Sequence, residues 1–186
     1  MEDWKETPLS EITSLITKGT TPSMIGASFT ESGIKYIKSE SILDNSRILD
    51  SSKFAFISLE THDRLKRSQI EENDLLFSMA GMFLGKTAIV TKNDIPANTN
   101  QAVAIIRIIP NKADFKFIYY YLNQKNIVKY INNLSGQSAQ PNINLQQIGS
   151  LNINLPPLPT QQKIAQILSS LDDKIELNNK INANLE

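Results

Sequence analysis

The chain has 186 residues, of which 40% are hydrophobic and 20% charged, and its 19 basic side chains balance its 19 acidic ones. This composition fits one globular domain with an appendage, and the zero net charge argues against a protein that coats nucleic acid without specificity. The absence of cysteine excludes disulfides, thiolate catalysis and cysteine-type zinc sites. No apolar run approaches the roughly 18 residues of a membrane span, so we expect a cytoplasmic protein without a membrane partner.

The first half of the chain alternates short apolar segments with polar loops. Residues 8–17 are expected to form a short helix that ends at Gly19, followed by a loop of small polar residues. Gly81 and Gly85 would allow tight turns at a hairpin tip and leave residues 82–84 exposed. Short strands are expected at 34–37, 54–57, 74–78 and 86–91, with a helical turn at 59–65.

The second half contains the most apolar segment. Residues 102–109 are almost continuously apolar and rich in β-branched side chains, which predicts a central strand buried on both faces. A long helix is expected over 114–134 and a last strand over 151–155. The predicted fold class is therefore α+β, with a mixed domain of short strands and helices over 1–155 and a C-terminal region over 156–186 that consists mainly of one long coiled-coil helix.

Catalytic signatures are missing from the sequence. The one histidine, His62, lies in a polar stretch and is expected to be a solvated surface residue. We find no nucleophile elbow, no phosphate-binding glycine loop and no metal-ligand spacing. The sequence therefore predicts a protein that is not an enzyme and that holds no metal.

Charge is distributed unevenly along the chain. Lysines and one arginine gather in two groups that could form basic faces, namely Lys35, Lys38, Arg47 and Lys53, and Lys112, Lys116, Lys125 and Lys129. A solvated surface is the ordinary alternative for such groups. A DNA-binding face, if the chain has one, must come from local segregation of this kind.

The C-terminal stretch has the clearest periodicity. Prolines at 156, 157 and 159 oppose regular structure, and Thr160 offers an N-cap, so a helix is expected to begin there. Apolar residues then recur at steps of four and three, with one polar residue in the seam, as in coiled coils whose register is fixed by a buried amide. The predicted partner-binding residues are Ile164, Ile167, Leu168, Leu171, Ile175, Asn178, Ile181 and Leu185. The alternative is an amphipathic helix that folds back onto its own domain.

The segment LPPLPTQQKIAQILSSLDDKIELNNKI, at 155–181, resembles the conserved region that closes each target-recognition half of the specificity (S) subunit of type I restriction-modification systems. Other segments resemble the earlier blocks of such a half, in the expected order. They are WKETPLSEITSLITKGTTPS at 4–23, GIKYIKSESI at 33–42, ENDLLFSMAGMFLGKTAIV at 72–90, NQAVAIIRI at 100–108 and SGQSAQPNIN at 135–144. The family's S subunits commonly carry two such halves in one chain, and this chain has one.

The resemblance implies a target-recognition domain that binds double-stranded DNA at a bipartite sequence. It implies a methyltransferase (M) subunit carrying S-adenosylmethionine as partner, in some systems a restriction (R) subunit, and no cofactor on this chain. The single half suggests a homodimer, or a pair with another S subunit, formed through the C-terminal helix, which would also dock the M subunit. Two alternatives remain: a half-length assembly protein that pairs without reading DNA, and the specificity subunit of a related type II system.

Polar loops that match the family's blocks supply the candidate DNA contacts. They are Lys18, Gly19, Thr20, Thr21, Ser23, Lys38, Ser39, Ser78, Lys86, Gln137, Ser138, Gln140 and Asn142. Amide side chains can bond adenine at two points and lysine can reach guanine, whereas hydroxyls and lysine also bind phosphates. Composition therefore does not separate the base contacts from the phosphate contacts.

Overall fold

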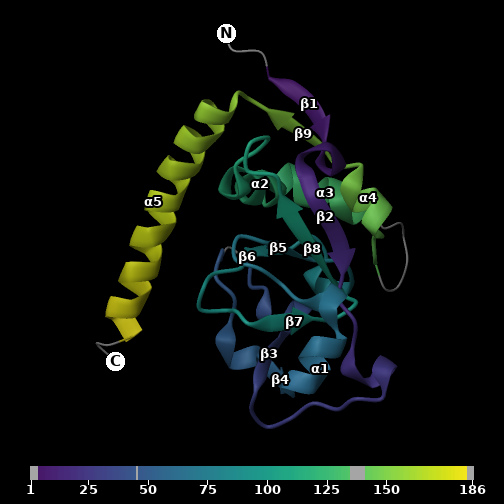
Figure 1. Cartoon of the computed structure of the whole chain (residues 1–186). Helices are drawn as coiled ribbons and strands as arrows, with labels where there is room; N and C mark the ends of the chain where they lie inside the picture. The colour runs from purple at the N-terminus through teal and green to yellow at the C-terminus, as the bar shows by residue number, and fades with distance from the viewer. Residues whose placement is uncertain (1–3, 45, 135–140, 184–186) are drawn as a thin grey trace.

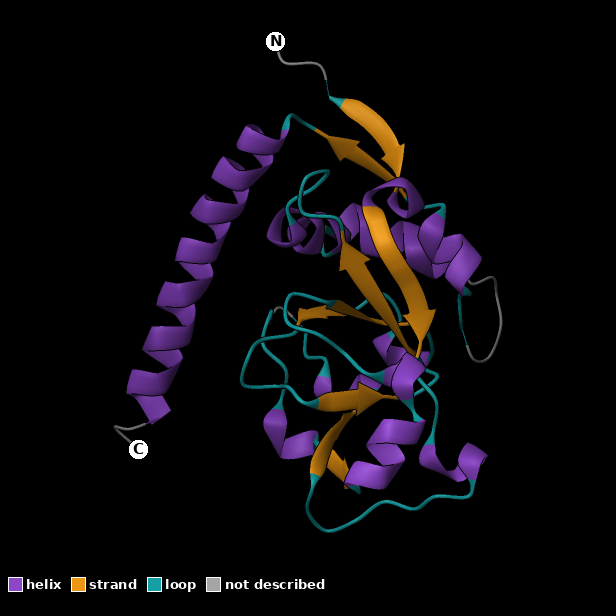
Figure 2. Cartoon of the chain, viewed as in Figure 1, coloured by secondary structure: helices purple, strands orange, loops and turns teal. Residues whose placement is uncertain are grey.

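The computed structural model describes residues 4–44, 46–134 and 141–183. Its strands are β1 (Lys5–Pro8), β2 (Thr13–Lys18), β3 (Ile34–Ile37), β4 (Ala55–Ile57), β5 (Leu75–Ser78), β6 (Thr87–Ile89), β7 (Ala97–Thr99), β8 (Val103–Ile108) and β9 (Asn152–Leu155). Its α-helices are α1 (Leu59–Arg64), α2 (Phe115–Leu122), α3 (Lys125–Leu134), α4 (Leu145–Gly149) and α5 (Leu158–Ala183). The α+β prediction is confirmed (Figure 2).

Three small sheets build the domain. The largest is antiparallel with the order β2-β8-β5-β6, the second has the order β4-β3-β7, and β1 pairs with β9. Figure 1 shows α2, α3 and α4 near one end of the four-stranded sheet and the β4-β3-β7 sheet with α1 near the other. The long helix α5 leaves the end of β9 and runs down one side of the domain.

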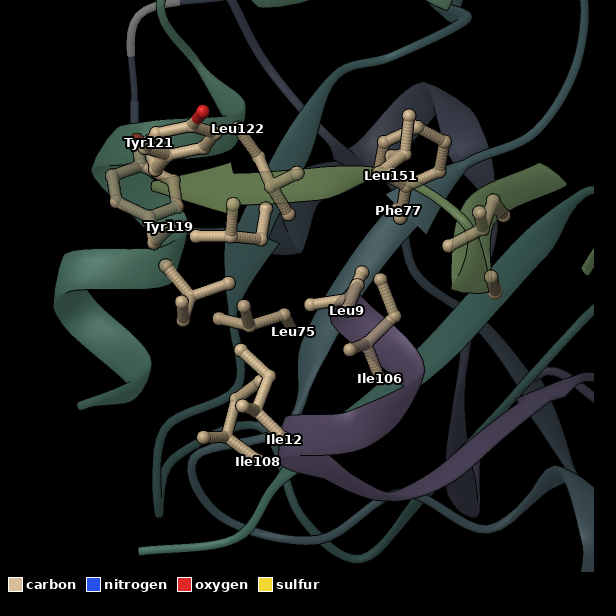
Figure 3. Close-up of a cluster of buried hydrophobic side chains, with 14 of the residues drawn as sticks. Leu9, Ile12, Leu75, Phe77, Ile106, Ile108, Tyr119, Tyr121, Leu122 and Leu151 are labelled. Carbon is tan, nitrogen blue, oxygen red and sulfur yellow. The ribbon is translucent and has the colours of Figure 1, made fainter. Parts of the chain in front are cut away.

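The four-stranded sheet is buried on both faces. Phe77 and Ile106 point into the larger cluster with Leu9 and the aromatic side chains of α2 (Figure 3). Their neighbours in the strands, Leu76 and Ile105, belong to the second cluster on the opposite face, because successive side chains of a strand alternate between faces. Double burial explains the continuous apolar run of β8, whose central position is confirmed.

The helix predicted over residues 8–17 is wrong. The segment instead ends β1, makes a 3-10 turn at Leu9–Ile12 and continues as β2. The apolar spacing of Leu9, Ile12 and Ile16 imitates a helix. Pairing of β2 with β8, in which Ile16 lies opposite Ile106, decides the structure, since β-branched side chains pack well on a half-buried sheet.

Two other helix boundaries differ from the prediction. The helix expected over 114–134 is interrupted, and α2 ends where the side chain and backbone N–H of Asn123 both donate to the Tyr119 carbonyl. The helix α5 begins at Leu158, two residues before Thr160. Pro159 is tolerated because the first turn of a helix needs no N–H donors.

Candidate nucleic-acid interface

The loop after β2 is fixed on the end of the β3-β7 pair. A Cβ atom on Gly19 would lie 1.9 Å from the Thr99 carbonyl oxygen, so only glycine fits there. The Thr20 N–H donates to that oxygen at 3.1 Å, and the Tyr36 hydroxyl donates to the Thr20 carbonyl at 3.0 Å. Burial raises the pKa of Tyr36 to about 12, so this donor stays protonated even in alkaline solution. The loop is therefore preorganised.

Side chains distant in sequence hold the outer part of this loop. The Thr21 hydroxyl donates to the amide oxygen of Gln101, and the Arg67 guanidinium donates to the Thr20 hydroxyl at 3.1 Å. Arg64 donates to the Ile25 carbonyl at 2.8 Å. Arg64, Arg67 and Gln101 were not among the predicted contacts. The basic run from Arg64 to Arg67 was a usable signal, whereas the contact with Gln101 spans 80 residues and has no local signature.

The end of β3 joins the same region through β7. The Thr99 hydroxyl donates to the Ile37 carbonyl at 2.7 Å, directly before Lys38 and Ser39. The Lys38 ammonium lies 5.2 Å from the centre of the Phe29 ring and 3.6 Å from a carboxylate oxygen of Glu40. The first loop and the Lys38 segment, predicted as separate contacts, thus meet around Thr99.

A cavity of about 510 Å³ adds an amide-rich wall. Lys18, Gln101 and Asn142 line it, together with Asn144 and Gln146. Asn142 reaches this position through a β-bridge with Ala80. Lysine and arginine can bind phosphates while the neighbouring amides contact base edges. A surface that recognises a DNA sequence needs both kinds of contact, because phosphate contacts position the protein and base contacts give specificity. We call Lys18–Ser23, Lys38, Ser39, Gln101 and Asn142 the loop surface.

Two predicted contacts lie elsewhere. Ser78 is fully buried within β5, so its proposed DNA contact is corrected to a core position. Lys86 pairs with Asp44 at 2.8 Å and lines a different cavity of about 340 Å³, together with Lys125 and Lys129 of α3. Gln137, Ser138 and Gln140 lie outside the described residues.

The exposure of the side chains also corrects the predictions for the glycine tip and for His62. Met82 is 85% exposed, as predicted for the tip, but Leu84 is buried against the core. His62 is half-buried rather than solvated, and its ring bonds to the buried side chain of Asn98. The predicted basic group around Lys35 does not form a single face, since Lys35 donates to the Asn93 carbonyl and Arg47 contacts α5.

The two faces of α5 have opposite character. Its domain-facing side buries Gln161, Ala165 and Ser169. Ile164 and Leu168 are partly covered, and Leu185 lies outside the described residues. The side facing solvent carries five apolar side chains that are 47–63% exposed, Ile167, Leu171, Ile175, Leu177 and Ile181, with the exposed Asn178 among them. We call these five residues the outer stripe.

The described part of the chain offers neither a membrane span nor a metal site. No helix within it combines the length and apolar character that crossing a bilayer requires. Among the same residues, no three His, Cys, Asp or Glu side chains gather closely enough to hold a metal ion.

Comparison with known proteins places this geometry in a family. The family model described as "Type I restriction modification DNA specificity domain" matches residues 1–186. The MjaX specificity subunit of Methanocaldococcus jannaschii is 29% identical in an alignment of 184 positions that covers 96% of this chain and 42% of that protein. The HindI specificity subunit of Haemophilus influenzae is 28% identical in an alignment of 197 positions, gaps included, that covers 100% of this chain and 39% of that protein.

A solved structure shares the fold. The S subunit of a type I restriction-modification system from M. genitalium superimposes with a TM-score of 0.68 at 18% identity, over 99% of this chain and 44% of that one. The chain thus spans less than half the length of these relatives. Because the family model covers the whole sequence, the chain belongs to the family of type I restriction-modification DNA specificity domains.

Proposed function

We propose that this chain recognises a specific double-stranded DNA sequence for a type I restriction-modification system. The observation that carries the proposal is the loop surface, where Lys18, the Thr20–Thr21 loop, Gln101 and Asn142 converge on one end of the four-stranded sheet. The chain itself contributes recognition. An M subunit would supply the methyl donor S-adenosylmethionine and the chemistry, and an R subunit, where present, would cleave.

The outer stripe supports pairing through α5. Five exposed apolar side chains along one side of a helix indicate a partner, because a soluble monomer gains nothing by displaying them. A second copy, or another S subunit, could cover the stripe as an antiparallel coiled coil, which would bring two recognition domains into one complex. The helix of 26 residues is about 39 Å long. Two domains held at its ends would lie about 11 to 12 base pairs apart, close to one turn of the duplex.

The outer stripe also favours a second function. A half-length assembly protein could pair with an S subunit through α5 without reading DNA. Both functions predict pairing, and sequence-selective DNA binding separates them.

DNA binding by the loop surface can be tested by fluorescence anisotropy with duplex libraries at several salt concentrations. We expect selective binding that weakens as salt rises, with a slope of about −0.9 per phosphate neutralised. Lys18→Ala should weaken binding because Lys18 is exposed beside the loop. Lys92→Ala is the matched control, since this exposed lysine follows β6 at the opposite end of the sheet. Equal effects of the two changes, or no selective binding, would contradict recognition through this surface.

A further inference from the structure

Acidic side chains of α5 are held by the recognition domain about midway along the helix. The Tyr120 hydroxyl of α2 donates to the Asp172 carboxylate at 2.7 Å. The Arg47 guanidinium donates from Nε to Glu176 at 2.9 Å, and from Nη2 to Asp173 and at 3.4 Å to the second oxygen of Glu176. A single planar side chain thus bridges two carboxylates on successive turns of α5.

The geometry of this bridge is that of a strong contact. The Arg47 side chain is only 16% exposed and that of Glu176 is 25% exposed, so water competes weakly for both. The hydrogen bond to Glu176 and the nearby carboxylates raise the pKa of Arg47 further above its ordinary value. The rigid guanidinium fork fixes direction as well as distance, which a lysine would not do.

The loop that carries Arg47 is itself anchored on the four-stranded sheet. The Arg47 carbonyl accepts from the Ile89 N–H of β6 at 2.9 Å. Within the same loop, Asp44 pairs with Lys86 at 2.8 Å. A displacement of α5 at the bridge would therefore have to disturb the sheet edge or break the bridge.

The helix is held along a line of contacts that ends at Arg47. Near its start, Ala165 and Ser169 are buried and the Gln161 side chain accepts from the Asp114 N–H at 3.0 Å, which fixes where the helix leaves the domain. Tyr120 then holds Asp172 and Arg47 holds Glu176, about one and two turns beyond Ser169. Figure 1 shows α5 continuing beyond the domain's α2, so the Arg47 contact is the one that bears most on the direction of the helix end.

We infer that Arg47 is a positioning residue that sets the angle between α5 and the recognition domain. Given the pairing in the proposed function, on which this second step rests, that angle also sets the separation of the two recognition domains. Specificity for the gap between half-sites would then depend on a residue that touches no DNA.

Distance measurement by pulsed electron resonance tests the angle in the full chain without DNA. The sequence has no cysteine, so Lys92→Cys and Asn179→Cys give two unique nitroxide sites, one just after β6 and one on α5 beyond the bridge. With the labelled chain diluted into excess unlabelled chain, so that a pair carries only one labelled copy, we expect one narrow distance distribution, and at least a twofold broadening when Arg47→Ala is added. The pair Asp173→Asn and Glu176→Gln, which keeps side-chain size, should broaden it equally and decides the matter if Arg47→Ala does not fold.

A control separates positioning from general stability. Arg64→Ala also removes a guanidinium contact between distant segments, to the Ile25 carbonyl, but leaves α5 untouched, so it should not change the distance distribution. An unchanged distribution with both the Arg47 change and the neutral pair would overturn the inference, while DNA recognition would stand.

The second measurement is the length of the gap between the two half-sites of the methylated target. With the partner methyltransferase, Arg47→Ala should permit several gap lengths where the unmodified chain permits one, with both half-site sequences retained. A single unchanged gap in Arg47→Ala would overturn the link between the angle and the spacing. Failure of the unmodified chain to select any sequence would overturn the proposed function instead, because the spin-label distances do not depend on DNA.

Discussion

The four-stranded sheet and α5 differ in how much of their apolar surface they bury. The sheet buries Phe77 and Ile106 on one face and Leu76 on the other, within this chain's own hydrophobic core. The helix turns Ala165, Ser169 and its acidic side chains toward the domain and displays the outer stripe to solvent. The core therefore stabilises this chain, whereas the outer stripe of α5 is available to another one.

The largest expected effect is on the free energy of unfolding, when a side chain of the sheet core is removed. Phe77→Ala should lower the free energy of unfolding by about 3–5 kcal/mol, because it removes a fully buried aromatic ring and leaves a cavity. Ile175→Ala on the outer stripe should change it by less than about 0.5 kcal/mol in the monomer. Urea denaturation at low protein concentration measures both. A large effect of Ile175→Ala there would show that the stripe stabilises its own domain.

The next effect concerns association. Leu171→Asp puts a charge in the middle of the outer stripe and should weaken pairing by about 100-fold, or ~2.7 kcal/mol, without unfolding the domain. Analytical ultracentrifugation at micromolar concentration reads the change. Gln166→Asp, an exposed position off the stripe, is the matched control and should pair normally. A monomeric unmodified chain would argue against self-pairing and leave a different S subunit as the partner.

The sequence predicted some parts of the sheet and of α5 correctly and others wrongly. The β-branched run of β8 identified a doubly buried strand because burial on both faces leaves a direct mark on composition. The same reasoning misread β2, since Leu9, Ile12 and Ile16 fit a helical spacing and only pairing with β8 excludes it. Periodicity predicted Ile167, Leu171, Ile175 and Ile181 of the outer stripe and missed Leu177. It also included Ile164 and Leu168, which the domain partly covers, and gave Thr160 as the start of the helix instead of Leu158.

The candidate site was likewise predicted only in part from the sequence. The resemblance located the first loop, yet it also nominated Ser78, which the strand alternation places inside the core. Gln101 and Arg47 could not be predicted, because their partners lie 80 and 126–129 residues away and neither residue stands in a distinctive local pattern. Long-range pairs of polar side chains become visible only in the folded chain.

The smallest expected effect is on the gap between the half-sites, and it tests whether α5 acts as a spacer. Four helical residues inserted after Asn179, beyond the Arg47 bridge, would add about 6 Å and rotate the end of the helix by about 40°. The preferred gap should widen by about one or two base pairs, at ~3.4 Å per pair, while the half-sites stay the same. A shift in the half-site sequences would show that the insertion disturbs recognition rather than spacing.

Sequencing of methylated DNA, after the unmodified chain is combined with its partner methyltransferase, tests the central claim most directly. The account predicts one bipartite target whose halves form an inverted repeat, since two identical recognition domains related by a two-fold axis impose that symmetry on the site. It also predicts that methylation at this target disappears when the chain is left out. Methylation that does not depend on the chain, or a target without two related halves, would contradict recognition by a pair of these domains.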